Sequence, residues 1–316
     1  MGEVSIRPYR PDDLLEVLEV LKVALGESPI LHRTPELWSW KHEINPFGRS
    51  LVLVAEVDGR IAGVRALMRW DLLTPAGVLL RCLRPVDTAT HADFERRGIF
   101  RQLTNAAVEQ AREDGFDLIF NTPNARSGAG YLTMGWQEVG PIGVMIRPLL
   151  RRGSPAGLDT APDPEVFFDP VPPLIQSLEQ PARRSAGLRT PRSIEYLAWR
   201  FRRHPHVHYR SISSGDGTAV VRPNVRGGRK EVVVSDLLGI AHRSSVSAAA
   251  HQARAAYLVG WFSPGSPERR AALAGGMLPV PGVRSLTLVA NPLHELPIDV
   301  FQLHNWDLAL SDLELL

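Results

Sequence analysis

The segment 90–102, Thr-His-Ala-Asp-Phe-Glu-Arg-Arg-Gly-Ile-Phe-Arg-Gln, holds the residues whose types and spacing most clearly predict chemistry. It follows a strand-like run, 78–88, and leads into apolar positions at helical spacing. Such a turn presents unpaired backbone N–H groups at the positive end of a helix dipole, an arrangement that binds phosphate. Gly98 lets the backbone approach a ligand, and Arg96 and Arg97 add positive charge. The segment therefore predicts binding of a pyrophosphate-bearing cofactor, with an ordinary turn capped by solvated arginines as the alternative.

A second pattern follows the next predicted strand, 117–122. Asn124 comes first, Tyr131 lies seven residues later, and Gly135-Trp136 begins four residues after Tyr131. Together the two segments resemble the GNAT superfamily of acyl-coenzyme A N-acyltransferases. The phosphate-binding turn of that family typically has the pattern V-x-P-x-Y-R-G-x-G-I-G, and its later segment has the same spacing of N, Y and G-F.

The resemblance includes the details around the turn. Residues 91–94, His-Ala-Asp-Phe, stand where the family often has H-P-D-Y. Two positions depart from the pattern, because Glu95 replaces the usual Arg or Gln and Phe100 replaces Gly or Ala. Phe100 is similar to the branch with G-I-F or G-L-L, which includes the enhanced-intracellular-survival type enzymes. The family binds phosphate mainly through backbone groups, so the resemblance implies that the Glu95 side chain can point away.

The predicted elements of the first half follow the order βααβββαβαβ. They include a helix at 14–25, a hairpin around Asp58-Gly59, a helix at 98–114 and a last strand at 136–148. The resemblance implies an α/β fold of the mixed-sheet α+β type over residues 1–148. In that fold the fourth and fifth strands, here 86–90 and 118–122, splay apart to admit the pantetheine arm of the cofactor.

The rest of the chain differs in character. Residues 149–189 are rich in proline and predict a linker, either a disordered spacer or an ordered arm that wraps a surface. Residues 190–316 repeat the order of elements in weaker form, including expected strands at 285–289 and 306–310, and lack the arginine-glycine turn. We interpret them as a degenerate second GNAT-like domain, with an unrelated α+β domain as the alternative. Trp199-Arg200-Phe201 echoes Trp38-Ser39-Trp40-Lys41.

The resemblance assigns the candidate site. The residues expected to bind the cofactor are Thr88, Ala89, Thr90, Glu95, Arg96, Arg97, Gly98, Ile99, Phe100 and Asn124. Tyr131 falls where the family's general acid usually lies, and a phenol can donate its proton to a departing thiolate. A core tyrosine is the alternative role for Tyr131, and a helix cap is the alternative for Asn124.

The general base is less defined. Asp87, on the fourth predicted strand, is the best candidate because a carboxylate there would lie near the splay. His91, His42 and Glu43 are alternatives, each with the simpler role of a structural or surface residue. Some members of the family use their own C-terminal carboxylate, and the terminal Leu316 keeps that route open. Deprotonation through water would need no dedicated side chain.

Composition limits the other classes of function. The net charge of +2 at pH 7 argues against nucleic acid as a partner, and no apolar run is long enough to span a membrane. The single cysteine, Cys82, excludes an internal disulfide, so we expect a cytoplasmic protein. The histidines at 204, 206 and 208 could converge on one strand face but lack acidic or cysteine companions, so no metal is expected.

The sequence therefore predicts a GNAT-type acyl-CoA-dependent N-acetyltransferase. Acetyl-CoA or another acyl-CoA would be the cosubstrate, and the acceptor would be a primary amine of a small molecule that attacks directly in a ternary complex. A homodimer is possible. The alternative is a non-catalytic module that keeps the fold and binds acyl-CoA or a partner.

Overall fold

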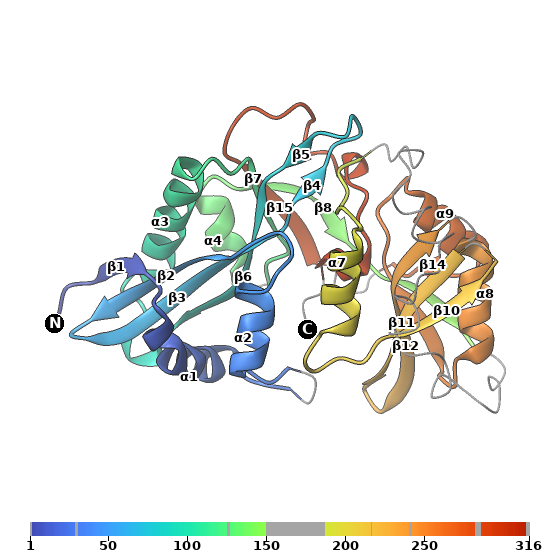
Figure 1. The fold of residues 1–316 in the computed structure, drawn as a ribbon, viewed down its shortest axis with the longest axis horizontal. Coiled ribbons are helices and arrows are strands. Elements are labelled where there is room, and N and C mark those ends of the chain that lie inside the picture. The colour runs from blue at the N-terminus through green and yellow to red at the C-terminus, as the bar shows by residue number, and fades with distance from the viewer. Residues whose placement is uncertain are drawn as a thin grey trace.

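The computed structural model describes residues 2–28, 31–124, 127–149, 187–215, 217–239, 242–281 and 286–313. The predicted linker at 149–189 therefore lies mostly outside the described residues. Two mixed sheets lie side by side, each with helices packed on it (Figure 1). None of the described helices is long and apolar enough to cross a membrane.

The first sheet has seven strands in the order β1-β2-β3-β6-β7-β15-β8. Its strands are β1 (Ser5–Pro8), β2 (Leu51–Val57), β3 (Arg60–Arg69), β6 (Cys82–Thr90), β7 (Leu118–Asn121), β8 (Gln137–Ile142) and β15 (Leu286–Pro292). A separate two-stranded ribbon pairs β4 (Leu72–Leu73) with β5 (Leu79–Leu80). The predicted hairpin at Asp58-Gly59 is confirmed, since both residues adopt positive φ between β2 and β3.

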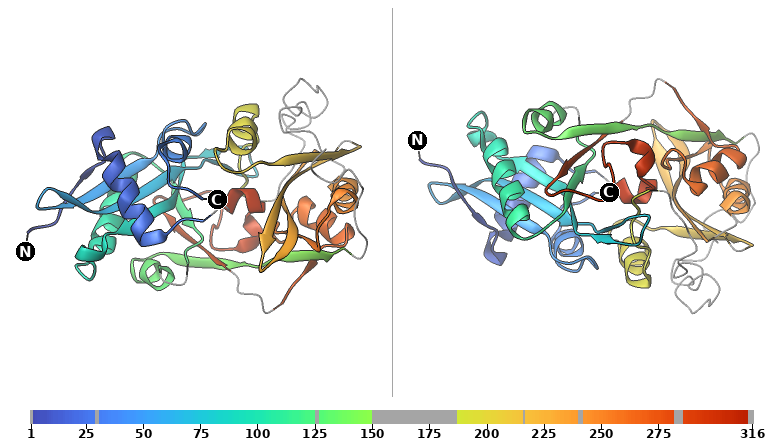
Figure 2. Two further views of the ribbon diagram at one scale, coloured as in Figure 1. Left: turned by 90° about the horizontal axis from the view of Figure 1, so that it is seen from below. Right: turned by 90° about the horizontal axis from the view of Figure 1, so that it is seen from above.

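Helices cover both faces of the first sheet (Figure 2). The helices are α1 (Leu14–Leu25), α2 (Pro35–His42), α3 (Ile99–Glu113) and α4 (Gly128–Thr133), with short 3-10 turns η1 (Pro11–Asp13) and η2 (Ala92–Phe94). The apolar side of α1 packs with Trp38 of α2 in one buried cluster, and α3 packs with Tyr131 of α4 in another. The sheet is thus a central layer, and each of its strands can present alternate side chains to two different surroundings.

The second sheet has six strands in the order β10-β11-β12-β13-β9-β14. Its strands are β9 (Met145–Pro148), β10 (Arg210–Ser214), β11 (Gly217–Arg226), β12 (Arg229–Gly239), β13 (Tyr257–Gly260) and β14 (Leu278–Pro279). The helical elements of this half are α7 (Ile194–Leu197), the π-helical turn η4 (Ala198–Arg202), α8 (His242–Gln252), α9 (Pro267–Ala274), the 3-10 turn η5 (Leu303–Asn305) and α10 (Leu310–Leu313).

The two halves exchange strands. β15, from the end of the chain, lies between β7 and β8 and is antiparallel to both, and β9, from the first half, lies between β13 and β14. The predicted single strand at 136–148 is therefore wrong: it is two strands that join different sheets. The predicted strand at 306–310 is also wrong, because this segment makes only isolated bridges and then forms α10.

A symmetric contact joins the halves. The indole Nε1 of Trp40 donates to the backbone oxygen of Trp199 at 2.9 Å, and the indole Nε1 of Trp199 donates to that of Trp40 at 2.8 Å. The two rings stack with centroids 4.6 Å apart. Thr34 caps α2, which carries Trp40, and Ser193 caps α7, which precedes the turn η4 that carries Trp199; each hydroxyl accepts from the backbone N–H three residues later. The two tryptophan segments noted in the sequence therefore contact one another and have matching N-caps.

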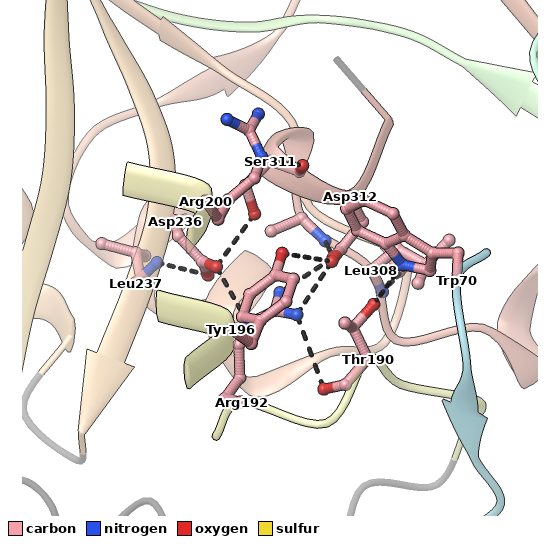
Figure 3. A network of polar contacts seen from close by, with 12 residues as sticks. Trp70, Thr190, Arg192, Tyr196, Arg200, Asp236, Leu237, Leu308, Ser311 and Asp312 are labelled. Atoms are coloured by element: carbon pink, nitrogen blue, oxygen red, sulfur yellow. Dashed lines mark hydrogen bonds and ion pairs between the residues drawn. The ribbon is translucent and has the colours of Figure 1, made fainter. Parts of the chain in front are cut away.

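A buried ionic network fixes the end of the described chain against the second half (Figure 3). The guanidinium of Arg192 lies 3.0 Å from Asp236 on β12 and 2.8 Å from Asp312 on α10. Ser311 donates its hydroxyl to Asp236 at 2.9 Å, and Phe262 bridges Ala309 after β13. The segment 308–313 thus lies against β12 and the residues that follow β13.

Candidate functional site

The cleft forms because β6 and β7 separate. They pair in parallel only at Cys82 with Leu118 and at Leu83 with Ile119, and beyond these two positions no ladder joins them. The opening encloses about 650 Å³, a volume in the range of small-molecule sites. The splay predicted for the fourth and fifth strands of the family is confirmed.

The walls of the cleft come from both halves of the chain. The lining residues are Ala24, Leu25, Leu31, Arg33, Lys41, Arg84, Pro85, Val86, Asp87, Thr88, Ala89, Thr90, Glu95, Phe100, Asn121, Thr122, Pro123, Asn124, Ser127, Gly130, Tyr131 and Leu313. Eight of the residues predicted from the sequence are in this set: Asp87, Thr88, Ala89, Thr90, Glu95, Phe100, Asn124 and Tyr131. The other four, Arg96, Arg97, Gly98 and Ile99, form the turn behind Glu95 and Phe100 and do not line the cleft.

The turn before α3 has the geometry that phosphate binding needs. Gly98 is the N-cap of α3 with φ of 72°, and Arg96 also has a positive φ, of 61°. The carbonyls four residues before the first turn lie outside the helix, so the backbone N–H groups at its start have no intrahelical acceptor. Ile99 is buried and anchors the helix, whereas the Arg97 side chain turns back to the backbone oxygen of Gly2 at 2.5 Å. The backbone, more than the arginine side chains, is therefore the anion-binding element here.

Tyr131 reaches the cleft from α4 and rests on a buried arginine. Its side chain is 2% exposed, and its hydroxyl oxygen accepts a hydrogen bond from Nη1 of Arg65 at 2.8 Å. Arg65, on β3, also donates to the Thr88 hydroxyl at 3.3 Å, and Nε and Nη2 of Arg65 have no hydrogen-bond partner among the described residues. Since the guanidinium occupies a lone pair of the phenol, the phenolic proton is left to donate elsewhere.

Asp87 lies at the centre of a cluster of cations. Its Oδ1 accepts from Arg33 at 2.9 Å, and its Oδ2 lies 3.0 Å from Nζ of Lys41 and 3.1 Å from Nε2 of His42. Burial alone would raise the pKa of the Asp87 carboxyl, but Lys41, His42 and Arg33 together hold that pKa well below its usual range. Burial lowers the pKa of His42, so its neutral form is favoured near pH 7. These contacts argue against Asp87 as the general base expected from the sequence, because a carboxylate with a depressed pKa is a poor proton acceptor.

The other candidate bases lie apart from the cleft lining. His91 caps the turn η2, where its Nδ1 accepts from the backbone N–H of Asp93 at 3.1 Å. Glu43 is the exposed C-cap of α2, and His42 sits behind Asp87. The chain terminus at Leu316 lies outside the described residues.

Arg84 connects the second half of the chain to the site. It lies at the point where β6 and β7 separate, and it donates to the backbone oxygens of Asp312 and, at 3.0 Å, of Leu313. Burial lowers the pKa of Arg84 to about 10. Because Leu313 lines the cleft, α10 forms part of its wall.

Four residues of the site escaped the sequence analysis: Arg33, Lys41 and Arg84, which line the cleft, and Arg65, which holds Tyr131. The signal that could have found Arg65 is a charge inside the otherwise apolar run of β3, since buried cations are rare without a reason. Arg84 stands in a similar run, Cys-Leu-Arg-Pro-Val, on β6. Arg33 and Lys41 give no local signal, because their partner Asp87 is about fifty residues away.

Comparisons with known proteins identify the first half. The family model described as an acetyltransferase (GNAT) domain matches residues 5–139. The N-terminal half is a GNAT acetyltransferase domain. This match confirms the resemblance seen in the sequence and the enzyme class that goes with it. No curated protein matches the chain at a significant level.

Solved structures with the same fold span both halves. Eis1 from Mycobacterium abscessus is 17% identical, with 92% of this chain and 74% of that chain covered at a TM-score of 0.61. A GCN5-related N-acetyltransferase from Kribbella flavida is 13% identical, with 92% and 72% covered at 0.62. A protein from Pyrococcus horikoshii, proposed to be an acetyltransferase, is 13% identical, with 96% and 92% covered at 0.54. At these identities the likeness concerns the fold, and it confirms the mixed α/β architecture across both halves of the chain.

A glycine in α4 allows a test of the cleft. A Cβ atom on Gly130 would lie 3.1 Å from the ring of Phe100 at the cleft wall, whereas a Cβ on Gly128, two residues earlier, would meet nothing within 4 Å. We expect Gly130→Val to weaken coenzyme A binding about tenfold or more in calorimetry, since overpacking costs about 1–3 kcal/mol. Gly128→Val is the control and should bind as the unchanged protein does; equal affinities for all three would contradict the assignment of the cleft.

Proposed function

We propose that the chain transfers an acetyl or other acyl group from acyl-CoA to a primary amine of a small molecule, by direct attack in a ternary complex. The observation that carries the proposal is the early separation of β6 from β7 beside the turn at 95–100. The separated strand 86–90 offers unpaired backbone groups to a pantetheine arm, and the free N–H groups at the start of α3 suit a diphosphate. The residues present therefore fit acyl-CoA.

Tyr131 is proposed as the general acid. In the reaction the amine nitrogen forms a bond to the thioester carbonyl carbon, the carbon–sulfur bond breaks, and the thiolate takes the phenolic proton of Tyr131. The proton that the attacking nitrogen loses as the amide forms passes to water, and water returns a proton to the Tyr131 phenolate. Arg65 holds the phenol oxygen at 2.8 Å, so that the hydroxyl hydrogen is directed away from the guanidinium and the resulting phenolate lies beside a cation. Arg65 is thus a positioning residue for Tyr131.

Asp87 is proposed to hold Lys41 and Arg33 in place rather than to accept the proton of the amine. Among the described residues that line the cleft, the only other carboxylate is Glu95, in the turn before α3. Loss of the ammonium proton to water, before or during attack, is consistent with this arrangement. The positive charge near Asp87 would favour the neutral amine.

Two measurements on the full chain test the proposal. Calorimetry is expected to show one acetyl-CoA bound per chain, and a panel of primary amines is expected to contain at least one that releases thiol from acetyl-CoA above the rate without amine. Binding without any thiol release would support a non-catalytic acyl-CoA-binding module instead. If the protein does not bind acetyl-CoA, both the transferase and the acyl-CoA-binding module are excluded.

A further inference from the structure

The two faces of β6 carry different chemistry within one cleft. Thr88 contacts Arg65, and through it the side of Tyr131 and α4, whereas Asp87 contacts Arg33 and Lys41 on the side of α1 and α2. Successive side chains of a strand point to opposite faces, so the general acid and the cation cluster flank the same stretch of backbone. Given the proposed function, the α1 and α2 side is where the acceptor would enter.

This acceptor side has an excess of positive charge. Arg33 and Lys41 both line the cleft and are only 7% and 4% exposed. They bring two positive charges against the single negative charge of Asp87, while His42 is favoured in its neutral form. Among the described residues only Asp87 forms an ion pair with either cation, because the Glu27 carboxylate accepts from the backbone N–H of Arg33 at 2.7 Å and not from its guanidinium. A buried charge is costly unless it is paired, so the pair of cations can accept a further anion.

Both cations keep hydrogen atoms that are not engaged. Arg33 donates through Nη1 to Asp87 and through Nε to the backbone oxygen of Gly26 at 3.2 Å, and its Nη2 meets no acceptor among the described residues. Lys41 uses one of its three ammonium protons, on Asp87. Both oxygens of Asp87 are already bound by these neighbours. Arg33 and Lys41 can therefore bind an anion, and the Asp87 carboxylate has no free oxygen for a further cation.

Arg84 is the third cation of the cleft lining, but it does not add to the cluster of Arg33 and Lys41. Its guanidinium donates to the backbone oxygens of Asp312 and Leu313, so it is engaged away from Arg33 and Lys41. The excess at Arg33 and Lys41 thus amounts to one charge, which matches a carboxylate better than a doubly charged phosphate.

We propose that the amine acceptor carries a carboxylate, bound by Arg33 and Lys41, so that the substrate class is amino acids or similar amine–carboxylate compounds. This inference rests on the proposed function and narrows its acceptor. The same charge excess disfavours an ammonium ion in the cleft, and so promotes the neutral amine that the reaction needs. A carboxylate handle offsets that repulsion for the substrate as a whole.

Matched acceptors test the charge directly. Glycine, alanine, phenylalanine and glutamate would each be compared with the corresponding α-amide at saturating acetyl-CoA, with thiol release as the readout. We expect kcat/KM for the best amino acid to exceed that of its amide at least about tenfold, as a charged hydrogen-bonded pair commonly contributes. Amides that react as well as or better than the acids would overturn the proposal. A carboxylate of this chain that is already bound by Arg33 and Lys41 would remove the preference for acids in the same way, and it would also overturn the proposal.

A binding measurement separates this proposal from the proposed function. The N-acetyl derivative of each amino acid and its amide would be titrated into coenzyme A-saturated protein, which requires no turnover. The acid should bind at least about tenfold more tightly; equal affinities would overturn the proposal whether or not the chain is active. Failure of the proposed function, by contrast, would appear as absent acetyl-CoA binding or absent thiol release with every amine.

Arg33→Gln provides the matched variant, because glutamine can still donate to Asp87 but carries no charge. The ratio of acid to amide, in affinity and in kcat/KM, should fall toward one. Arg60→Gln removes an exposed arginine that pairs with Asp93 at 3.1 Å and should keep the ratio. A ratio unchanged in Arg33→Gln would overturn the assignment of Arg33, and thermal unfolding of each variant shows whether the fold is retained.

Discussion

Tyr131→Phe is expected to lower kcat about 100-fold or more while the KM for acetyl-CoA changes little. The substitution keeps the ring packed between Phe100 and Trp136 but removes the hydroxyl that Arg65 holds at the cleft. General acid catalysis by a positioned side chain contributes about 10² to 10⁴ in rate, which sets the size of the effect. Steady-state thiol release over a range of pH measures it.

Tyr257→Phe is the control for this prediction. Tyr257 lies on β13 in the second half, where its hydroxyl donates to Glu231 at 2.5 Å, so it also loses a hydrogen bond but far from the cleft. Its rate should match that of the unchanged protein. Full activity of Tyr131→Phe across the pH range would show that the thiolate leaves without help from this phenol.

Asp87→Asn is expected to lower the free energy of unfolding by about 3–5 kcal/mol at pH 7. Removing one partner of a buried ionic cluster leaves the other charges uncompensated, and here Arg33 and Lys41 would lose their shared carboxylate. The pKa of Asp87 is held well below its ordinary value. The stabilisation is therefore complete above the ordinary carboxyl range and is lost as the pH falls toward the depressed pKa. Urea unfolding at pH 7 and at successively lower pH measures both effects, and the two proteins should converge in acid.

Asp93→Asn is the matched control, because Asp93 also pairs with an arginine but its side chain is 59% exposed. Its effect should stay below about 1 kcal/mol, as for other surface ion pairs. An Asp87→Asn protein as stable as the unchanged one would mean that the cation cluster is not held together by this carboxylate.

The parts of the fold that the sequence predicted are those whose causes are local. The turn at Gly98 and the helix after it follow from a glycine beside a helical pattern, and the hairpin at Asp58-Gly59 follows from its dipeptide. The strand exchange could not be predicted in this way. The pattern indicated a strand near 285–289, but the sequence of β15 does not indicate that this strand lies between β7 and β8 and not in the second sheet.

In the candidate site, too, the residues with a local sequence signal were predicted and those that depend on distant partners were not. Tyr131 and Asn124 were found because the family pattern fixes their spacing. Arg65 acts through Tyr131, which is 66 residues away, and the cations around Asp87 come from a different element, so their meaning depends on the assembled sheet. The role of Asp87 shows this most clearly, because a carboxylate on the splayed strand predicted a base until its neighbours Arg33, Lys41 and His42 were known.

The most direct test of the central claim is a crystal structure of the protein with acetyl-CoA. We predict that the diphosphate contacts backbone N–H groups of residues 95–100, that the pantetheine arm follows β6 along residues 86–90, and that the sulfur lies within hydrogen-bond reach of the Tyr131 hydroxyl. Acetyl-CoA bound elsewhere, or β6 and β7 closed into a continuous ladder beyond Leu83 and Ile119, would contradict the account.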